Sequence, residues 1–336
     1  MRSELPSDEI DIKAGSVQVS ANHDDWVSSV AVRGSLVVTG CYDNTVNIWR
    51  VEGGKVLVIP GHTQPVKAVA WLGEDRLVSC GQDQVVNMMR WEESSNSVTT
   101  VNTCRGHQRS VDTVSVSPDQ NTFATGSWDT TVKVWSSRLV EEGQEEPGEG
   151  GSQAKRSKGV GVTRTPLQTM AGHKEAVSGL AWLDRTELAS VSWDHTIKVW
   201  DLELGGLKSE LVGNKAFFSC SYNPAVSSLL TSSADRSVRL YDPRAGEASA
   251  QIVKAVYSSH QGWVSSVSWC QGSQHYFLSA SHDNLIKMWD SRSFKTPLYD
   301  LTGHSDKVLC CDWSNPAYIA SGGADNSLKI FKSKIS

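Results

Sequence analysis

Seven short segments of this chain share one pattern, in which an aspartate is followed by apolar residues that alternate with polar ones. The clearest read DNTVNIW, DTTVKVW, DHTIKVW and DNLIKMW, and weaker copies read DQVVNMM, DRSVRLY and DNSLKIF. This period of two predicts a β-strand with one buried face. In five copies the fourth residue after the aspartate is basic, namely Lys133, Lys198, Arg239, Lys287 and Lys329.

The segments recur at the spacing of propeller blades, which is roughly 40 to 45 residues. Only the step from Asp129 to Asp194 is much longer, and six of the seven aspartates follow a histidine at a nearly constant distance. Between each histidine and the end of the aspartate segment that follows it, apolar runs account for three strands. The apolar run between that segment and the next histidine accounts for a fourth. The pattern predicts an all-β fold, a seven-bladed β-propeller. The aspartates are Asp43, Asp83, Asp129, Asp194, Asp235, Asp283 and Asp325, and the earlier positions are His23, His62, His107, His173, Asn214, His260 and His304.

The ends of the chain suggest how the ring closes. The last copy stops after its third strand, whereas SVQVSANH before His23 supplies a spare one. We therefore predict that Ser16 to Ala21 completes the seventh blade and removes two open sheet edges. The predicted organisation is a short disordered segment, 1–15, and a propeller, 16–336. Its repeats are expected at about 16–50, 55–91, 98–136, 165–201, 206–242, 251–290 and 297–332.

Composition narrows the function. The chain has 336 residues and a formal net charge of −5, which disfavours a broad basic surface and hence extensive nucleic-acid binding. No apolar run reaches the length that a membrane-spanning helix needs, so we expect no membrane partner. Its seven cysteines show no CxxC spacing, and we expect neither disulfides nor a metal site. No phosphate-binding or other cofactor motif is present, so no cofactor is predicted.

Each copy also has a hydroxyl residue four positions before its aspartate, so histidine, serine or threonine, and aspartate repeat the chemical groups of a hydrolase triad. An enzyme needs one such site, and this set occurs six or seven times. We therefore expect a structural role, no catalytic residue and no enzymatic activity.

The GH start, the S-x-x-x-D core and the WD end of the copies resemble the WD-repeat family, over about residues 16–336. The resemblance implies that histidine, hydroxyl, aspartate and tryptophan form a buried hydrogen-bonded chain in each complete blade. The complete sets are His23, Thr39, Asp43 and Trp49; His107, Thr125, Asp129 and Trp135; His173, Ser190, Asp194 and Trp200; and His260, Ser279, Asp283 and Trp289.

Partner contacts in this family lie on the loops of one face, three residues after the histidine and one before the aspartate. Aromatic residues are frequent at these positions, and exposed tryptophan and tyrosine concentrate binding energy. Packing of the rings between blades is the alternative, and buried tryptophans would favour it. The predicted partner face contains Trp26, Tyr42, Trp128, Trp193, Phe217, Trp263, His282 and Lys307.

The long step holds an insertion, residues 137–162, that is rich in glycine, glutamate and serine. Its low apolar content predicts disorder. The KRSK run at 155–158 is a solvated charge cluster, a nuclear-import element or an RNA contact, and the sequence leaves these alternatives open.

Residues outside the repeat pattern give a finer resemblance. HDDWVSS at 23–29, GVTRTPLQTMAGH at 161–173, GNK at 213–215, PLYDL at 297–301 and SGGADN at 321–326 are similar to the WD-repeat subunits of the nucleolar PeBoW complex. This resemblance implies a scaffold that acts with pescadillo and the block-of-proliferation protein on the pre-60S particle. It would serve maturation of 28S/25S and 5.8S rRNA and assembly of the 60S subunit, in the nucleolus and nucleoplasm.

Two points qualify that expectation. Members of that family carry an amino-terminal ubiquitin-like domain that recruits the midasin ATPase. Only the short segment 1–15 precedes the predicted closing strand here, which puts midasin recruitment in doubt.

A short motif leaves another function open. The pattern WDxR fits the run Trp289, Asp290, Ser291 and Arg292, so a substrate receptor of a cullin-type ubiquitin ligase is an alternative function. A general signalling scaffold is another.

Overall fold

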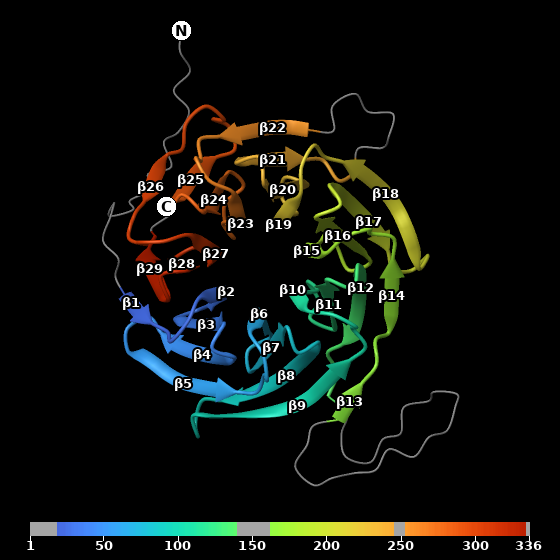
Figure 1. Cartoon of the computed structure of the whole chain (residues 1–336), viewed down its shortest axis with the longest axis vertical. Coiled ribbons are helices and arrows are strands. Elements are labelled where there is room, and N and C mark those ends of the chain that lie inside the picture. The colour runs from blue at the N-terminus through green and yellow to red at the C-terminus, as the bar shows by residue number, and fades with distance from the viewer. Residues whose placement is uncertain (1–18, 140–161, 245–252, 334–336) are drawn as a thin grey trace.

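Seven sheets stand in a ring (Figure 1), as a β-propeller requires, and their strands pair antiparallel except for one parallel pair in blade 2. Inner-strand residues of all seven blades line a central channel. This computed structural model describes residues 19–139, 162–244 and 253–333. The predicted seven-bladed all-β fold is confirmed. Within these three ranges no helix is long and apolar enough to cross a membrane. The disorder predicted for residues 1–15 and for most of 137–162 lies outside the described residues.

The first four blades follow the chain in order. Blade 1 contains β2 (Val27–Arg33), β3 (Leu36–Cys41), β4 (Thr45–Arg50) and β5 (Gly54–Pro60). Blade 2 contains β6 (Val66–Leu72), β7 (Arg76–Gly81), β8 (Val85–Glu92), β9 (Ser97–Arg105) and β13 (Val162–Arg164). Blade 3 contains β10 (Val111–Val116), β11 (Thr122–Ser127), β12 (Thr131–Ser136) and β14 (Gln168–Ala171). Blade 4 contains β15 (Val177–Trp182), β16 (Glu187–Ser192), β17 (Thr196–Asp201) and β18 (Gly206–Val212).

The remaining three blades complete the ring. Blade 5 contains β19 (Phe217–Asn223), β20 (Ser228–Ser233), β21 (Ser237–Tyr241) and β22 (Val253–Ser258). Blade 6 contains β23 (Val264–Trp269), β24 (Tyr276–Ser281), β25 (Ile286–Asp290) and β26 (Tyr299–Leu301). Blade 7 contains β27 (Val308–Asn315), β28 (Tyr318–Gly323), β29 (Ser327–Lys332) and β1 (Val19–Asn22).

The closing strand comes from the start of the chain. Strand β1 pairs antiparallel with β29, from Val19 opposite Ile330 to Asn22 opposite Ser327. The two strands lie side by side in Figure 1. The pairing confirms a propeller closed by an amino-terminal strand, because blade 7 takes three strands from one end of the chain and one from the other.

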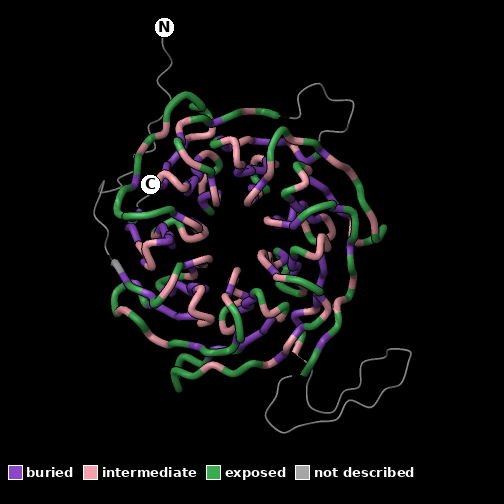
Figure 2. The backbone as a smooth tube through the Cα atoms, viewed as in Figure 1, coloured by how far each residue is buried: buried purple, intermediate pink, exposed green. Residues whose placement is uncertain are grey.

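The third strands are buried on both faces, so the prediction of a single buried face was wrong for them. In three of the five copies the basic residue at the fourth position is itself buried: Lys133, Lys198 and Lys287 are 8%, 4% and 4% exposed. Each ammonium group contacts the fourth strand of its own blade, at Thr169, Glu210 and Asp300 respectively. Blades stack face to face, and Figure 2 shows exposure concentrated on the loops and outer strands.

Blade 2 has a fifth strand that the repeat pattern did not predict. Strand β13 pairs parallel with β9, with Val162 opposite Asn102 and Arg164 opposite Cys104. Arg164 Nη2 donates to the carbonyl oxygen of Arg138 at 2.5 Å. The fourth strand of blade 3 is therefore β14, and the segment just before it belongs to the neighbouring blade (Figure 1).

Candidate partner-binding face

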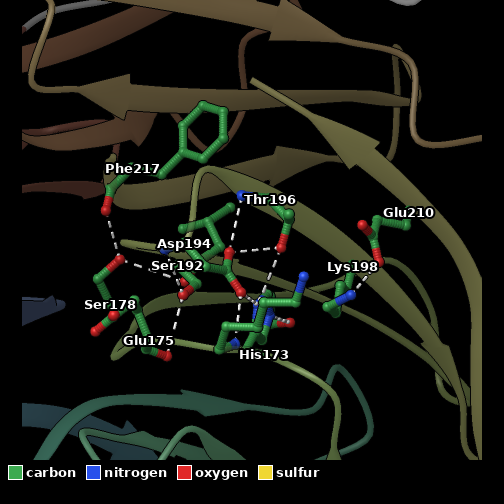
Figure 3. Close-up of polar contacts among 12 residues, drawn as sticks. His173, Glu175, Ser178, Ser192, Asp194, Thr196, Lys198, Glu210 and Phe217 are labelled. Carbon is green, nitrogen blue, oxygen red and sulfur yellow. Dashed lines mark hydrogen bonds and ion pairs between the residues drawn. The ribbon is translucent and has the colours of Figure 1, made fainter. Parts of the chain in front are cut away.

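A buried polar chain fixes the loops of each complete blade, and Figure 3 shows the part of it around His173, Asp194 and Thr196 in blade 4. His173 Nε2 lies 2.7 Å from Ser190 Oγ, and Nδ1 lies 2.8 Å from Asp194 Oδ2. Trp200 Nε1 donates to the same Ser190 oxygen at 2.8 Å. The Asp194 carboxylate also accepts from the backbone amide of Lys174 at 2.9 Å, which ties the loop before β15 to the turn after β16.

Blades 3 and 6 repeat this geometry. His107 contacts Thr125 and Asp129, both at 2.8 Å, and Trp135 Nε1 donates to Thr125 Oγ1. His260 contacts Ser279 at 2.7 Å and Asp283 at 2.8 Å, and Trp289 Nε1 donates to Ser279 Oγ. The hydroxyl residues are fully buried, so no substrate can reach them.

Hydrogen bonds keep these aspartates ionised. Burial alone would raise the pKa of the Asp283 carboxyl, but bonds from His260 and the Gln261 amide lower it to about 2. Burial lowers the pKa of His107, and its bond to Asp129 opposes that shift. The charge therefore stays on the carboxylate, and the groups serve to hold loops in place.

Blade 1 departs from the predicted set, because no hydrogen bond joins its described histidine and aspartate. His23 contacts Thr39 Oγ1 and Asn47 Nδ2, both at 3.2 Å, and Trp49 Nε1 donates to Thr39. Asp43 instead accepts from the amide and hydroxyl of Thr45. The prediction of a complete four-residue chain in blade 1 was wrong in this link, and the Asn47 amide takes the place of the carboxylate.

The same loop contains a possible metal-ligand set. One ligand atom each from His23, Cys41 and Asp43 lies within 4.8 Å of the others. Burial raises the pKa of the Cys41 thiol to about 12, and the thiol donates to the Asp25 carbonyl. Cys41 occupies the position of Ser127 in blade 3, so we assign the set to loop bonding.

Blades 2, 5 and 7 have incomplete chains. His62 and His304 keep their serine and aspartate contacts without a tryptophan. In blade 5, Asp235 accepts from Arg239, and Thr231 Oγ1 is buried with no hydrogen-bond partner among the described residues.

Four tryptophans lie exposed on the predicted partner face. Trp26, Trp128, Trp193 and Trp263 are 43%, 38%, 39% and 52% exposed. Tyr42 and His282 are half-buried, and Lys307 is exposed. Packing wholly between blades therefore does not account for these tryptophans.

Phe217 does not belong to this face, so its inclusion was wrong. It is 1% exposed and packs on Tyr241 with ring centroids 6.3 Å apart. The loop before blade 5 is one residue shorter than counted, because Gly213 rather than Asn214 stands four residues before the first strand. The Phe217 ring fills the space beside Gly213, where an added Cβ would lie 2.4 Å from it.

A β-bulge near the start of every first strand supplies side chains that the repeat positions did not indicate. The register shifts in all seven blades, and the seven bulged residues line a cavity of about 310 Å³ at the mouth of the channel. Bulges often re-aim side chains at functional sites. The bulged residues are Ser28, Lys67, Asp112, Ser178, Phe218, Ser265 and Leu309.

The three bulged serines join neighbouring blades. Ser28 Oγ donates to the carbonyl of Val66 at 2.7 Å, and Ser178 and Ser265 make the equivalent bonds to Phe217 and Val308. These bonds connect the inner strands of blades 1 and 2, of blades 4 and 5, and of blades 6 and 7.

Phe218 completes an arc of aromatic side chains over blades 3 to 6. The Trp128 and Trp193 centroids are 4.9 Å apart, and Phe218 lies 6.1 Å from Trp193 and 5.7 Å from Trp263. His282 follows 5.6 Å from Trp263. We call these five side chains the aromatic arc. Such pairs hold each other in place without hiding the rings from solvent.

Lys67 and Asp112 connect the aromatic arc to blade 1. Lys67 Nζ donates to the Tyr42 hydroxyl at 2.5 Å and lies 3.9 Å from Asp112 Oδ2. Trp128 Nε1 donates to that carboxylate at 2.7 Å, and the Trp26 ring lies 5.5 Å from Tyr42. Sequence reasoning missed Lys67, Asp112 and Phe218 because all three are bulged. Each directly follows the first apolar residue of its first strand, and this position could have indicated them.

Comparison with known proteins agrees with this geometry. The family model described as WD domain, G-beta repeat matches the chain seven times, at residues 15–50, 53–88, 98–136, 164–201, 205–242, 252–290 and 295–332. Ribosome biogenesis protein WDR12 homologues are similar to it over 93% of its length. The homologue of Drosophila pseudoobscura pseudoobscura is 50% identical over 316 residues, which cover 73% of that protein. That of Culex quinquefasciatus is 48% identical over 319 residues, which cover 74%. Seven matched repeats and half-identical relatives show that the chain belongs to the WD-repeat family of WDR12 ribosome biogenesis proteins.

Proposed function

We propose that this chain is a non-enzymatic scaffold in ribosome biogenesis and that it acts within the PeBoW complex. Its role would be maturation of 28S/25S and 5.8S rRNA and assembly of the 60S subunit, in the nucleolus and nucleoplasm. The similarity to ribosome biogenesis protein WDR12 homologues supports the biogenesis role. The repeated histidine, hydroxyl and aspartate sets support a scaffold, because their buried groups bond to each other.

The observation that carries the proposal is the exposed aromatic arc. Three exposed tryptophans, two in direct ring contact and the third joined to them through Phe218, form the kind of surface that concentrates binding energy in protein interfaces. We propose the block-of-proliferation protein as the direct partner on this face, with pescadillo and the pre-60S particle joined through it. Recruitment of midasin and direct RNA contact play no part in this proposal.

The test is affinity purification of the tagged chain from nuclear extract, with blotting for both PeBoW partners and for precursor rRNA. The Trp193→Ala, Trp263→Ala double variant should weaken partner recovery at least about tenfold, as loss of interface anchors does. Phe294→Ala is the matched control, because Phe294 is 55% exposed on the connection between β25 and β26, at the other end of its blade. Recovery of neither partner with the unmodified chain would exclude the PeBoW assignment.

The ubiquitin-ligase alternative depends on Arg292. Its guanidinium is bound to both carboxylate oxygens of Asp290, at 2.9 and 2.7 Å. The ion pair takes up only Nε and Nη2 of a side chain that is 40% exposed, so it neither supports nor excludes contact with an adaptor. Recovery of a cullin adaptor that is lost on Arg292→Ala would favour this alternative over the PeBoW assignment.

A further inference from the structure

Charged side chains are unevenly distributed around the aromatic face. The loops before the first strands and the turns after the second strands form this face. Over blades 3 to 5 these segments carry four exposed cations, Arg109, Lys174, Lys215 and Arg236. Glu175 is their one exposed acid, since Asp129, Asp194 and Asp235 are bonded within their blades.

Blades 7 and 1 have the opposite character. Asp24 and Asp306 are exposed and Asp25 is half-exposed, with Lys307 as the one exposed cation in these loops. Asp25 accepts from the Trp26 amide and Asp306 from the Lys307 amide, both at 2.7 Å. These bonds to adjacent backbone hold the carboxylates at the loop tips without neutralising them.

The charges in both sectors are unpaired within the part of the chain that the structure describes. None of the four cations or three aspartates forms an ion pair with another described residue, whereas Lys67 and Asp112 between the sectors neutralise each other. The face therefore has a cationic sector, blades 3 to 5, and an anionic sector, blades 7 and 1, with the aromatic arc extending over blades 3 to 6.

We infer that the protein partner docks with an acidic region over the cationic sector and a basic region over the anionic sector. The aromatic arc would supply affinity, and the charges would set how the partner is rotated about the channel axis. This inference rests on the function proposed above. Single-stranded RNA fits less well, because a uniformly negative backbone would be repelled by Asp24, Asp25 and Asp306.

Charge-reversal variants distinguish an effect of the charge arrangement on this face from an effect of the net charge of the chain. The first variant is Lys174→Glu with Lys215→Glu, the second is Asp24→Lys with Asp306→Lys, and the third combines both and so keeps the net charge of the chain. Lys295→Glu is the control, because Lys295 is exposed on the connection between β25 and β26. Association with purified block-of-proliferation protein is measured by surface plasmon resonance at low and high salt.

Polarity predicts that the first and second variants each associate about tenfold more slowly at low salt, and that the combined variant is slowest. High salt should reduce these differences, because exposed charges are then screened. Steering by net charge alone instead predicts opposite effects for the first two variants and none for the combination. That result, or rates within about twofold of the unmodified chain for all three, would overturn the inference while leaving the proposed function intact.

A second measurement needs no partner. Fluorotryptophan resonances, assigned through single Trp→Phe variants, are followed while tetraglutamate or tetralysine peptide is added. Tetraglutamate should shift the Trp193 signal, and tetralysine should shift the Trp26 signal. Equal shifts by both peptides would contradict the polarity even if the block-of-proliferation protein did not bind.

Affinity purification of the first charge-reversal variant gives one further outcome. Loss of rRNA from this variant with an unchanged protein complex would assign the cationic sector to RNA instead.

Discussion

One residue in each blade adopts a left-handed backbone conformation directly after the anchoring aspartate. The φ angles are 58° to 73°, at Asn44, Gln84, Thr130, His195, Arg236, Asn284 and Asn326. Asparagine tolerates this region, whereas a β-branched residue is strained there. In blade 3 the turn is held by Asp129, whose Oδ1 accepts from the Thr131 amide at 3.0 Å. Thr130 is therefore strained at a position that supports the partner-binding face.

Replacing Thr130 by asparagine should relieve this strain. We expect Thr130→Asn to raise the free energy of unfolding by about 1 kcal/mol, because the φ of 69° would then suit the side chain. Denaturant unfolding followed by tryptophan fluorescence measures the change. Asn44→Thr, at a φ of 73° in blade 1, is the reciprocal control and should lower stability by a similar amount. No change in either variant would show that the turns are unstrained.

At the scale of elements, the closing strand has the clearest energetic role. Strand β1 satisfies the outer edge of β29, and Ala21 is buried in the cluster that joins blades 7 and 1. Deleting residues 1–21 should lower the melting temperature by several degrees or more, because blade 7 loses this edge strand and its apolar contacts. Calorimetry measures the shift.

Deleting residues 1–15 is the matched control for that truncation. It leaves the paired strand in place and should have little effect on melting. Equal melting temperatures for the unmodified chain and the 1–21 deletion would mean that β1 contributes nothing to closure.

Periodicity was enough to predict the four strands of each repeat, but not the additional strand β13 or every pairing. The β1 pairing follows from counting strands, since one blade lacked a fourth. Strand β13 could not be found in this way. The short segment Val162–Arg164 carries no period, and it pairs with a strand of blade 2 although it lies in the chain between two strands of blade 3. The bulges were hidden for a related reason: register depends on the partner strand, and Lys67 or Asp112 read alone looks like an ordinary polar position.

For the whole molecule, the seam between blades 7 and 1 differs from the other inter-blade contacts described above. Asp312, on β27, accepts from the Val32 amide at 2.6 Å and from the Ser314 amide at 3.0 Å. The Ser314 hydroxyl donates to the Val32 carbonyl at 3.0 Å. The Asp312 carboxylate, with one oxygen on each amide, thus connects blade 7 to blade 1 and closes the ring. Three other blade junctions are instead joined by the serines Ser28, Ser178 and Ser265.

Asp312→Asn tests this seam. An asparagine amide would face its NH₂ group toward one of the two backbone amides, leaving a buried donor unpaired at a cost of about 1 to 3 kcal/mol. We expect the free energy of unfolding to fall by that amount. Ser221→Ala is the control at the equivalent position of β19, where a single acceptor for the Trp269 amide is lost, and it should cost less. An asparagine variant as stable as the unmodified protein would contradict the role of the paired oxygens.

The sequence was enough to predict which tryptophans form the candidate site, but not how the rings are arranged next to each other. Repeat positions indicated Trp26, Trp128, Trp193 and Trp263, because each stands at a fixed distance from a histidine or aspartate. Phe217 was misplaced since one loop is a residue shorter, and such a shift is invisible until Gly213 is seen beside the phenylalanine ring. The order of rings in the aromatic arc depends on which blades are neighbours in space.

Closure by β1 and β29 also bears on synthesis of the protein. These strands pair across almost the whole chain, so β1 leaves the ribosome long before its partner exists. At translation rates of about 5 to 20 residues per second, β1 must wait on the order of 15 to 60 s. A chain that stalls within the last blade cannot complete its ring, and unfinished copies would therefore be recognisable to chaperones by an open seam.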